Sequence, residues 1–153
     1  MAQKLHRTVA RNRKATFTYE ILDTFEAGLV LTGSEVKSLR AGKANLAQAY
    51  VRLEHGEAWL VGANIAQYPQ AGPHNNHEPE RPRKLLLKER ELIRLDRSVR
   101  EKGLTLVPLE LYFSGAWAKL SFGIGRGKKL HDKRQSVKER DAKRDMDRAR
   151  RGR

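Results

Sequence analysis

Apolar residues recur at every second position along several stretches of the chain, which is the pattern of strands with one buried face. Between residues 17 and 25, Phe17, Tyr19, Ile21 and Phe25 occupy alternate positions, and Asp23 breaks the row. Turn residues separate some of these stretches, as at 55–57, where His, Gly and Glu follow one another. The pattern predicts about six strands, at residues 17–25, 27–31, 49–53, 58–63, 104–113 and 117–124.

Two other stretches have helical features. A Thr-x-x-Glu capping box at Thr32 and Glu35 predicts the start of a short helix, and Gly42 is placed to end it. A second helix is predicted from about Lys84 to Lys102, because apolar residues recur there near helical spacing. Gly103 supplies its stop.

The links between the predicted strands are mostly too short for parallel crossovers, so antiparallel pairing is expected. Residues 68–83 hold four of the five Pro and are predicted to form a loop. Short strands with two inserted helices predict a mainly β fold with inserted helices, a small antiparallel barrel of the oligonucleotide-binding type.

The chain carries a formal net charge of +14, and this charge is concentrated at its two ends. Residues 1–14 contribute +5 and residues 126–153 contribute +8, while the stretch between them is nearly neutral. We therefore predict three parts: a basic N-terminal arm at 1–15, a barrel domain at 16–125 and a basic tail at 126–153. The tail has few apolar residues and is expected to be disordered in solution and helical when bound.

Basic arms around a neutral body attract polyanions, since each Lys or Arg that neutralises a phosphate releases counterions. A membrane surface would be the competing polyanion, but the tail has no Trp or Phe to insert into lipid. Nucleic acid is the better interpretation, and no membrane contact is expected. With no signal-like apolar stretch and no Cys, we expect a cytoplasmic protein, and a monomer.

Candidate chemistry is sparse. The run 123–129 has three Gly and two Lys but lacks the spacing and the Ser or Thr of a nucleotide-binding loop, so we interpret it as a flexible basic hinge. His74 and His77 with Glu78 and Glu80 could be drawn as a metal site, but a Pro-rich loop supplies no fixed frame, and we favour a solvated loop. We predict no metal, no cofactor and no enzymatic activity.

Several strings in the chain resemble the SsrA-binding (small protein B) family. They are NRKA at 12–15, FEAGLVLTGSEVKSLRAGKANL at 25–46, AYV with GEAWL, RKLLL at 83–87, GLTLVPLELYF, and GRGKKLHDKR at 125–134. These strings run in order over most of the chain, and the loop at 68–82 and the last dozen residues match least.

The resemblance implies an RNA-binding adaptor with an oligonucleotide-binding-like barrel. Members of the family grip the tRNA-like domain of transfer-messenger RNA (SsrA RNA) and bring it to stalled ribosomes for trans-translation, in which the incomplete peptide is tagged. The implied second partner is the ribosome, where the tail would enter the vacant mRNA path at the small-subunit decoding centre.

The resemblance also implies binding residues. Glu26 matches the Glu of the family's EAG motif, which is implicated in RNA binding; the alternative is a turn residue between two strands. Asn12 and Lys119 match further RNA-binding positions. For the basic candidates, a solvated surface charge stays the alternative. The predicted set for the tRNA-like domain is Asn12, Arg13, Lys14, Glu26, Lys37, Arg40, Lys84 and Lys119.

In the tail, His131 within LHDKR is the most specific candidate, because an imidazole can stack on an unpaired base. The predicted set for the ribosome is Arg126, Lys128, Lys129, His131, Asp132, Lys133, Arg134, Lys138 and Arg140. Outside both sets, Glu35 is assigned to helix capping and Leu85, Leu86 and Leu87 mainly to the core. Tyr50 could stack on a base, although a half-buried strand aromatic is the commoner case.

Two rival functions stay open. A structural ribosomal protein, or a general RNA-binding protein of the oligonucleotide-binding type, would share the basic ends and the small barrel. An RNA-processing enzyme is disfavoured, because no metal, triad or nucleotide motif is visible in the sequence.

Overall fold

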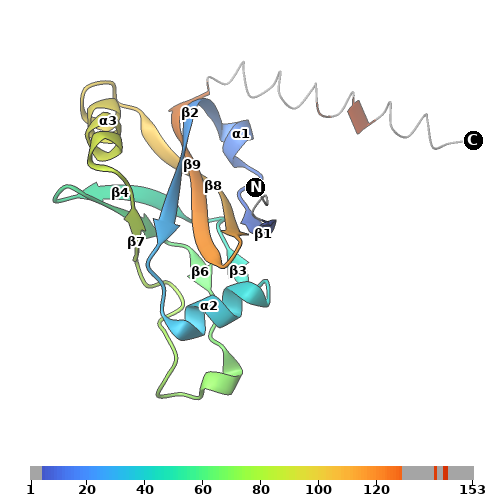
Figure 1. Cartoon of the computed structure of the whole chain (residues 1–153). Coiled ribbons are helices and arrows are strands. Elements are labelled where there is room, and N and C mark those ends of the chain that lie inside the picture. The colour runs from blue at the N-terminus through green and yellow to red at the C-terminus, as the bar shows by residue number, and fades with distance from the viewer. Residues whose placement is uncertain (1–4, 129–139, 141–142, 145–153) are drawn as a thin grey trace, which may run out of the picture.

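The computed structural model describes residues 5–128, 140 and 143–144, and antiparallel strands dominate it. Seven strands form one sheet and two more form a separate short pair (Figure 1). The strands are β1 (His6–Arg11), β2 (Tyr19–Leu29), β3 (Ala44–Asn45), β4 (Tyr50–Glu54), β5 (Glu57–Val61), β6 (Asn64–Ile65), β7 (Arg83–Leu86), β8 (Thr105–Ser114) and β9 (Trp117–Gly127). The sheet order is β1-β8-β9-β2-β7-β5-β4, and β3 pairs with β6.

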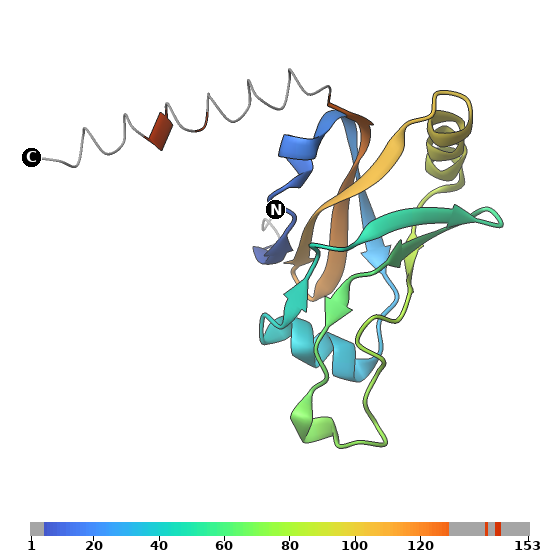
Figure 2. The same ribbon diagram turned by 180° about the vertical axis from the view of Figure 1, so that it is seen from behind.

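Short helical segments lie around the sheet. They are α1 (Ala15–Thr18), α2 (Gly33–Arg40), the 3-10 turn η1 (Pro69–Ala71) and α3 (Glu89–Arg100). Figures 1 and 2 show α2 and α3 at opposite ends of the sheet. In the described residues, no helix is long and apolar enough to cross a membrane.

The sheet curls so that β4 comes close to β8. The strand pairings are all antiparallel, but among the described strands no ladder joins β4 to β8. The barrel is therefore open along this seam. The predicted mainly β fold is confirmed, and the oligonucleotide-binding-like description is compatible with a barrel that is not closed.

The core lies inside the curled sheet and is closed by the two larger helices. Leu60 of β5, Leu120 and Phe122 of β9, Leu39 of α2 and Leu95 of α3 are all fully buried. Burial of each such side chain contributes roughly 1.5–3 kcal/mol, so contacts from distant parts of the chain hold the sheet in its curled form.

The second predicted helix begins later than its sequence pattern indicates. Residues Arg83–Leu86 form β7, which pairs with β2 and β5, and α3 begins only at Glu89. The two predicted strands at 17–31 are instead one long strand, β2, with an irregularity between Ile21 and Asp23. The predicted N-terminal arm at 1–15 contains β1 and ends at Ala15, the first residue of α1.

The predicted hinge at 123–129 is also wrong for its described part. Gly123, Gly125 and Gly127 belong to β9, which pairs with β2 along their whole length. A Cβ at Gly123 would lie 2.7 Å from the Ile21 side chain, so this glycine allows close packing. The glycines here serve a strand and not a flexible link.

The local signals at helix and turn ends are confirmed. Thr32 and Glu35 form the complete capping box of α2. Gly42 and Gly103 both have positive φ after the helices they end. Positive φ at His55 and Gly56 makes the tight turn between β4 and β5.

β7 is tied to α2 through a buried ion pair, and the loop 66–82 joins the same carboxylate through Arg81. Arg83 and Glu35 are both fully buried, with 2.5 Å between Arg83 Nε and Glu35 Oε2. Arg81 donates to the other carboxylate oxygen at 2.5 Å. Burial would raise the pKa of Glu35, but hydrogen bonds from Arg81, the Thr32 amide and Arg83 hold it below its usual value.

His77 does not lie in solvent, contrary to the sequence interpretation. It is buried, its Nδ1 lies 2.8 Å from Ser34 Oγ and its Nε2 lies 2.8 Å from the Ile65 carbonyl oxygen. His74 is exposed. Over the described ranges, no three His, Cys, Asp or Glu side chains are grouped as metal ligands.

Candidate nucleic-acid interface

The outer face of the β8-β9-β2 sheet brings together two residues predicted from the family resemblance. Glu26 of β2 pairs with Ser121, and Gly28 pairs with Lys119 of β9. Side chains alternate between the two faces of a strand, and Ala27 and Leu120 between these positions are buried in the core. Glu26 and Lys119 therefore project on the same outward face.

Glu26 is exposed and stands next to a buried phenol. Burial first, and then the Glu26 and Glu110 carboxylates, raises the pKa of Tyr112 far above its usual value. The Tyr112 hydroxyl is buried and makes no hydrogen bond of good geometry within the described residues, although it lies close enough to the Glu26 carboxylate to interact with it. Tyr112 pairs with Lys119, so the neutral phenol lies beside Glu26 on the same outward face, and the two Glu26 oxygens still have lone pairs for an external donor.

Lys119 is half-buried, and its ammonium has no hydrogen-bond or ion-pair partner in the described part of the chain. Two apolar side chains share this face with it. Leu86, which lies opposite Gly28 on β7, is 55% exposed, and Trp117 is 70% exposed. The assignment of Leu86 to the core is wrong. The sequence analysis did not select Trp117 as a surface contact. Its position beside a Gly-containing turn was the one sign in the sequence that it could be exposed.

β1 stabilises the rim of this face. His6 stacks on Tyr112 with ring centroids 4.3 Å apart. His6 Nε2 and Thr8 Oγ1 both lie 2.6 Å from Glu110 Oε1. Burial would raise the pKa of Glu110, but these two hydrogen bonds hold it below its usual value. Part of the predicted arm is thus fixed to the sheet.

Asn12 and Lys14 lie elsewhere, along the open seam. The Asn12 amide donates to the Pro108 carbonyl oxygen at 3.0 Å, and with Lys14 and Tyr50 it lines a hollow of about 270 Å³. Tyr19, the first residue of β2, also lines this hollow, so the hollow lies toward the opposite end of β2 from Glu26. Tyr50 is 47% exposed, which leaves its ring more open than expected.

The other predicted cations are dispersed. Lys37 is exposed with its ammonium 5.7 Å from the centre of the Tyr68 ring. Arg40 is exposed, and its carbonyl oxygen accepts from Arg7. Lys84 is half-buried and pairs with Glu57 at 3.1 Å. Arg13 is exposed at the start of α1. The eight predicted residues therefore do not form one continuous surface.

Only part of the predicted ribosome-binding set can be placed. Arg126 is exposed at the end of β9, 3.5 Å from Glu20. The Lys128 amide donates to the Thr18 carbonyl oxygen at 3.0 Å. The Arg140 guanidinium lies 5.7 Å from the centre of the Phe17 ring. The other members lie outside the described residues: Lys129, His131, Asp132, Lys133, Arg134 and Lys138.

A groove of about 680 Å³ borders Glu26, between β2 and the first half of α3. Its walls carry three cations that the sequence analysis did not select. The lining residues are Thr24, Phe25, Glu26, Lys88, Arg90, Glu91 and Arg94. The sequence held no signal for them, because only the packing of α3 beside β2 brings these cations next to Glu26.

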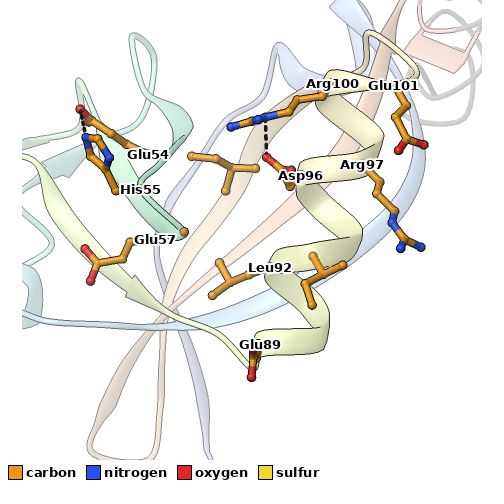
Figure 3. A pocket seen from close by; sticks show the side chains of 12 residues that line it. Glu54, His55, Glu57, Glu89, Leu92, Asp96, Arg97, Arg100 and Glu101 are labelled. Atoms are coloured by element: carbon orange, nitrogen blue, oxygen red, sulfur yellow. Dashed lines mark ion pairs between the residues drawn. The ribbon is translucent and has the colours of Figure 1, made fainter.

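A second groove, between α3 and the turn of the β4-β5 hairpin, differs in charge (Figure 3). Five carboxylates line it, against two arginines and a histidine. Several carboxylates already have partners, as Asp96 has with Arg100 at 2.9 Å. This acidic groove does not suit a phosphate backbone.

Comparisons with known proteins agree with the sequence resemblance. The family model described as SmpB protein matches residues 9–152. An SsrA-binding protein of Roseiflexus castenholzii is 55% identical over 145 residues, which cover 95% of this chain and 92% of that protein. One of Gloeobacter violaceus is 53% identical over 147 residues, 96% of each chain.

A solved structure is also similar. A chain from "tmRNA-SmpB: a journey to the center of the bacterial ribosome" superposes with a TM-score of 0.65 and 46% sequence identity. The match covers 89% of this chain and 95% of that chain. The likeness therefore extends over nearly the whole of both molecules.

Proposed function

Because the chain belongs to the SmpB protein family, we propose that it is an RNA-binding adaptor of trans-translation. It binds the tRNA-like domain of transfer-messenger RNA and delivers this RNA to stalled ribosomes, where the incomplete peptide is tagged. Its relatives are named SsrA-binding proteins, and its structural neighbour belongs to a tmRNA-SmpB complex of the bacterial ribosome.

The observation that carries the RNA-binding role is the outer face of β8-β9-β2. A sheet face with an exposed Leu and Trp, an unpaired Lys and an exposed carboxylate suits folded RNA, which presents unpaired bases and phosphates together. Bases can pack on Leu86 and Trp117, the Lys119 ammonium can meet a phosphate, and Glu26 can accept from a base amino group.

We assign the two predicted RNA sites to different parts of the chain. The barrel domain, with the N-terminal arm, holds the tRNA-like domain, and the basic tail enters the vacant mRNA path at the decoding centre. β9 runs to Gly127, so the tail proper begins after Lys128 in this proposal. Asn12, Lys14 and Tyr50 on the seam form a second contact surface within the barrel domain.

The deciding experiment is to identify the RNA that copurifies with the protein from its host. The proposal expects transfer-messenger RNA as the main species. Sedimentation then separates the adaptor from a structural ribosomal protein: the adaptor is substoichiometric to ribosomes and enriched on stalled ones. Stoichiometric presence on all ribosomes, without transfer-messenger RNA, would refute the proposal.

A further inference from the structure

The groove between β2 and α3 has a wall of cations facing an acidic residue. Lys88, Arg90 and Arg94 come from α3 or the residue before it, and Glu26 comes from β2. The volume of about 680 Å³ and the open shape give room for an extended chain. The groove continues the outer sheet face toward α3, because Glu26 belongs to both.

The three cations are not equivalent. Arg94 is engaged by the protein, since its guanidinium pairs with the Asp23 carboxylate and lies 5.4 Å from the centre of the Phe25 ring. Lys88 and Arg90 are exposed, and neither side chain has an ion-pair partner among residues 5–128. Two cations therefore remain available to a ligand in the groove.

The anions of the groove are similarly divided. Glu91 Oε1 accepts from the Lys88 backbone amide at 3.0 Å, which caps the start of α3. Glu26 is exposed and lies beside the Tyr112 hydroxyl, but its two carboxylate oxygens have lone pairs left for a further donor. The groove thus presents two available cations on one wall and one available hydrogen-bond acceptor on the other.

We propose that this groove binds an unpaired stretch of RNA, with its phosphates at Lys88 and Arg90 and a base amino group at Glu26. A phosphodiester chain alternates anionic groups with bases that carry donors, so it matches both walls at once. An unpaired strand can place any of its base edges against Glu26, whereas an A-form duplex presents only those in its shallow minor groove. The proposal rests on the proposed function, because it extends the same RNA site onto α3.

The first test compares two variants of equal charge. Lys88→Ala with Arg90→Ala removes the groove cations, and Arg97→Ala with Lys102→Ala removes two exposed cations that do not line this groove. Each variant is titrated with the isolated tRNA-like domain of transfer-messenger RNA at several salt concentrations. The groove variant should bind at least tenfold more weakly, and its salt slope should fall by about 1.4 for two lost contacts to a single strand.

The second test uses the absence of Cys from the chain. A single cysteine at Arg90, or at Lys102 as the control, carries a tethered iron chelate that cleaves nearby RNA. The Arg90 probe should cleave unpaired nucleotides of the tRNA-like domain, and the Lys102 probe should cleave them weakly. Cleavage confined to duplex, or equal from both probes, would overturn the inference.

The outcomes separate the inference from the function. If both double variants lose affinity equally, the effect is diffuse charge and the groove is not a site. If Glu26→Ala weakens RNA binding while the groove variant does not, the inference fails, the proposed function stands, and the groove serves another partner, such as an acidic protein. If the wild-type protein does not bind the tRNA-like domain, both fail.

Discussion

A carboxylate on a surface for RNA requires a chemical role, because it repels phosphates. At Glu26 the role is supplied by the neighbours: the Lys119 cation lies on the same face, and the neutral Tyr112 beside it adds no charge. A carboxylate so placed discriminates between RNA groups, since base amino groups can donate to it and phosphates cannot.

Glu26→Ala should therefore fold normally and bind the tRNA-like domain more weakly, by the one to three kcal/mol that is usual for such a contact, or about 5- to 150-fold. The side chain is exposed, so no core contact is lost. Binding is measured by titration and folding by thermal melting. The exposed Glu101 of the α3 terminus provides the control, and equal affinity of Glu26→Ala and Glu101→Ala would contradict the role.

The interior holds a second carboxylate with a structural role. Glu35→Gln would leave the fully buried Arg83 without its counter-charge, at a cost of about 3–5 kcal/mol in the free energy of unfolding. The pKa of Glu35 is lowered in the folded state. Its stabilisation is therefore complete above the ordinary value of about 4.5 and is lost as the pH falls below it.

Urea unfolding at pH 7 and at pH 3.5 should consequently show a large difference between wild type and Glu35→Gln that shrinks in acid. Glu101→Gln, which removes an exposed carboxylate, should show little difference at either pH. A difference that stays constant with pH would mean that the packing of Arg83, and not its charge pair, is what Glu35 provides.

For single residues, the sequence predicts a role correctly where that role depends only on near neighbours in the chain. The capping role of Glu35 follows from its spacing to Thr32, but its contact with Arg83 joins positions 48 apart in the chain. Leu86 and Leu85 are identical in type and adjacent, yet one is exposed and one is buried. Only the alternation of β7 separates them, and the sequence pattern assigned that segment to a helix.

At the scale of elements, the length of β9 determines where the folded domain ends and the tail begins. The run of glycines at 123–127 has a composition typical of a flexible link, but a strand with β2 and β8 on either side needs small residues where side chains cross closely. Sequence alone could not distinguish these cases, because the deciding contact, with Ile21, comes from a strand about a hundred residues earlier.

Gly123→Ala should lower the free energy of unfolding by about 1–3 kcal/mol, because its Cβ would overpack against Ile21. Gly127→Ala is the matched control, since a Cβ there meets no described atom within 4 Å. Chemical denaturation measures both. If Gly123→Ala left the free energy of unfolding unchanged, the result would favour the hinge interpretation of residues 123–129.

The prediction of a helix was wrong at residues 83–86, again because the deciding contacts come from distant parts of the chain. The sequence RKLLLKER is compatible with a helix, since its leucines and charges are good helix formers. Pairing with β2 and β5 instead draws Arg83–Leu86 into the sheet, where Leu85 is buried and Arg83 reaches Glu35. Tertiary contacts therefore override the local helix propensity of this segment. As a result α3 begins at Glu89, and its first turns lie at the edge of the face that carries Glu26.

The end of β9 gives an element-scale test of the division between the two RNA sites. Lys128→Glu with Lys129→Glu reverses charge just past the last paired residues, on the side where the tail begins. We expect nearly unchanged binding of the tRNA-like domain and a loss of accommodation on stalled ribosomes, because these lysines should face ribosomal RNA. If affinity for the isolated domain falls as far as peptide tagging does, the two sites are not separate.

At the scale of the whole molecule, charge is distributed differently from hydrophobicity. The periodic apolar pattern ends with β9, while residues 129–153 add 11 basic and 5 acidic side chains and few apolar ones. Sequence reasoning could predict this separation because net charge and periodicity are both local properties. It placed the boundary at 125, but β9 continues to Gly127, and the Lys128 amide is bonded to Thr18.

Truncation should accordingly be made after Lys128, which preserves the whole of β9 and its contact with Thr18. The truncated chain should melt at the wild-type temperature, since none of the core residues is removed. It should also bind the tRNA-like domain with little change in salt slope, because that slope counts only phosphates neutralised in that complex.

Peptide tagging on stalled ribosomes, however, should be lost in the same truncated chain, because nothing would occupy the vacant mRNA path in place of a codon and anticodon. The control is the full-length protein carrying Glu26→Ala, which should lose RNA affinity first and tagging as a consequence. Tagging at the full rate by the truncated chain would make the tail a nonspecific tether. Loss of binding to the isolated tRNA-like domain would instead assign the tail to that RNA, because the body alone would then be insufficient to hold it.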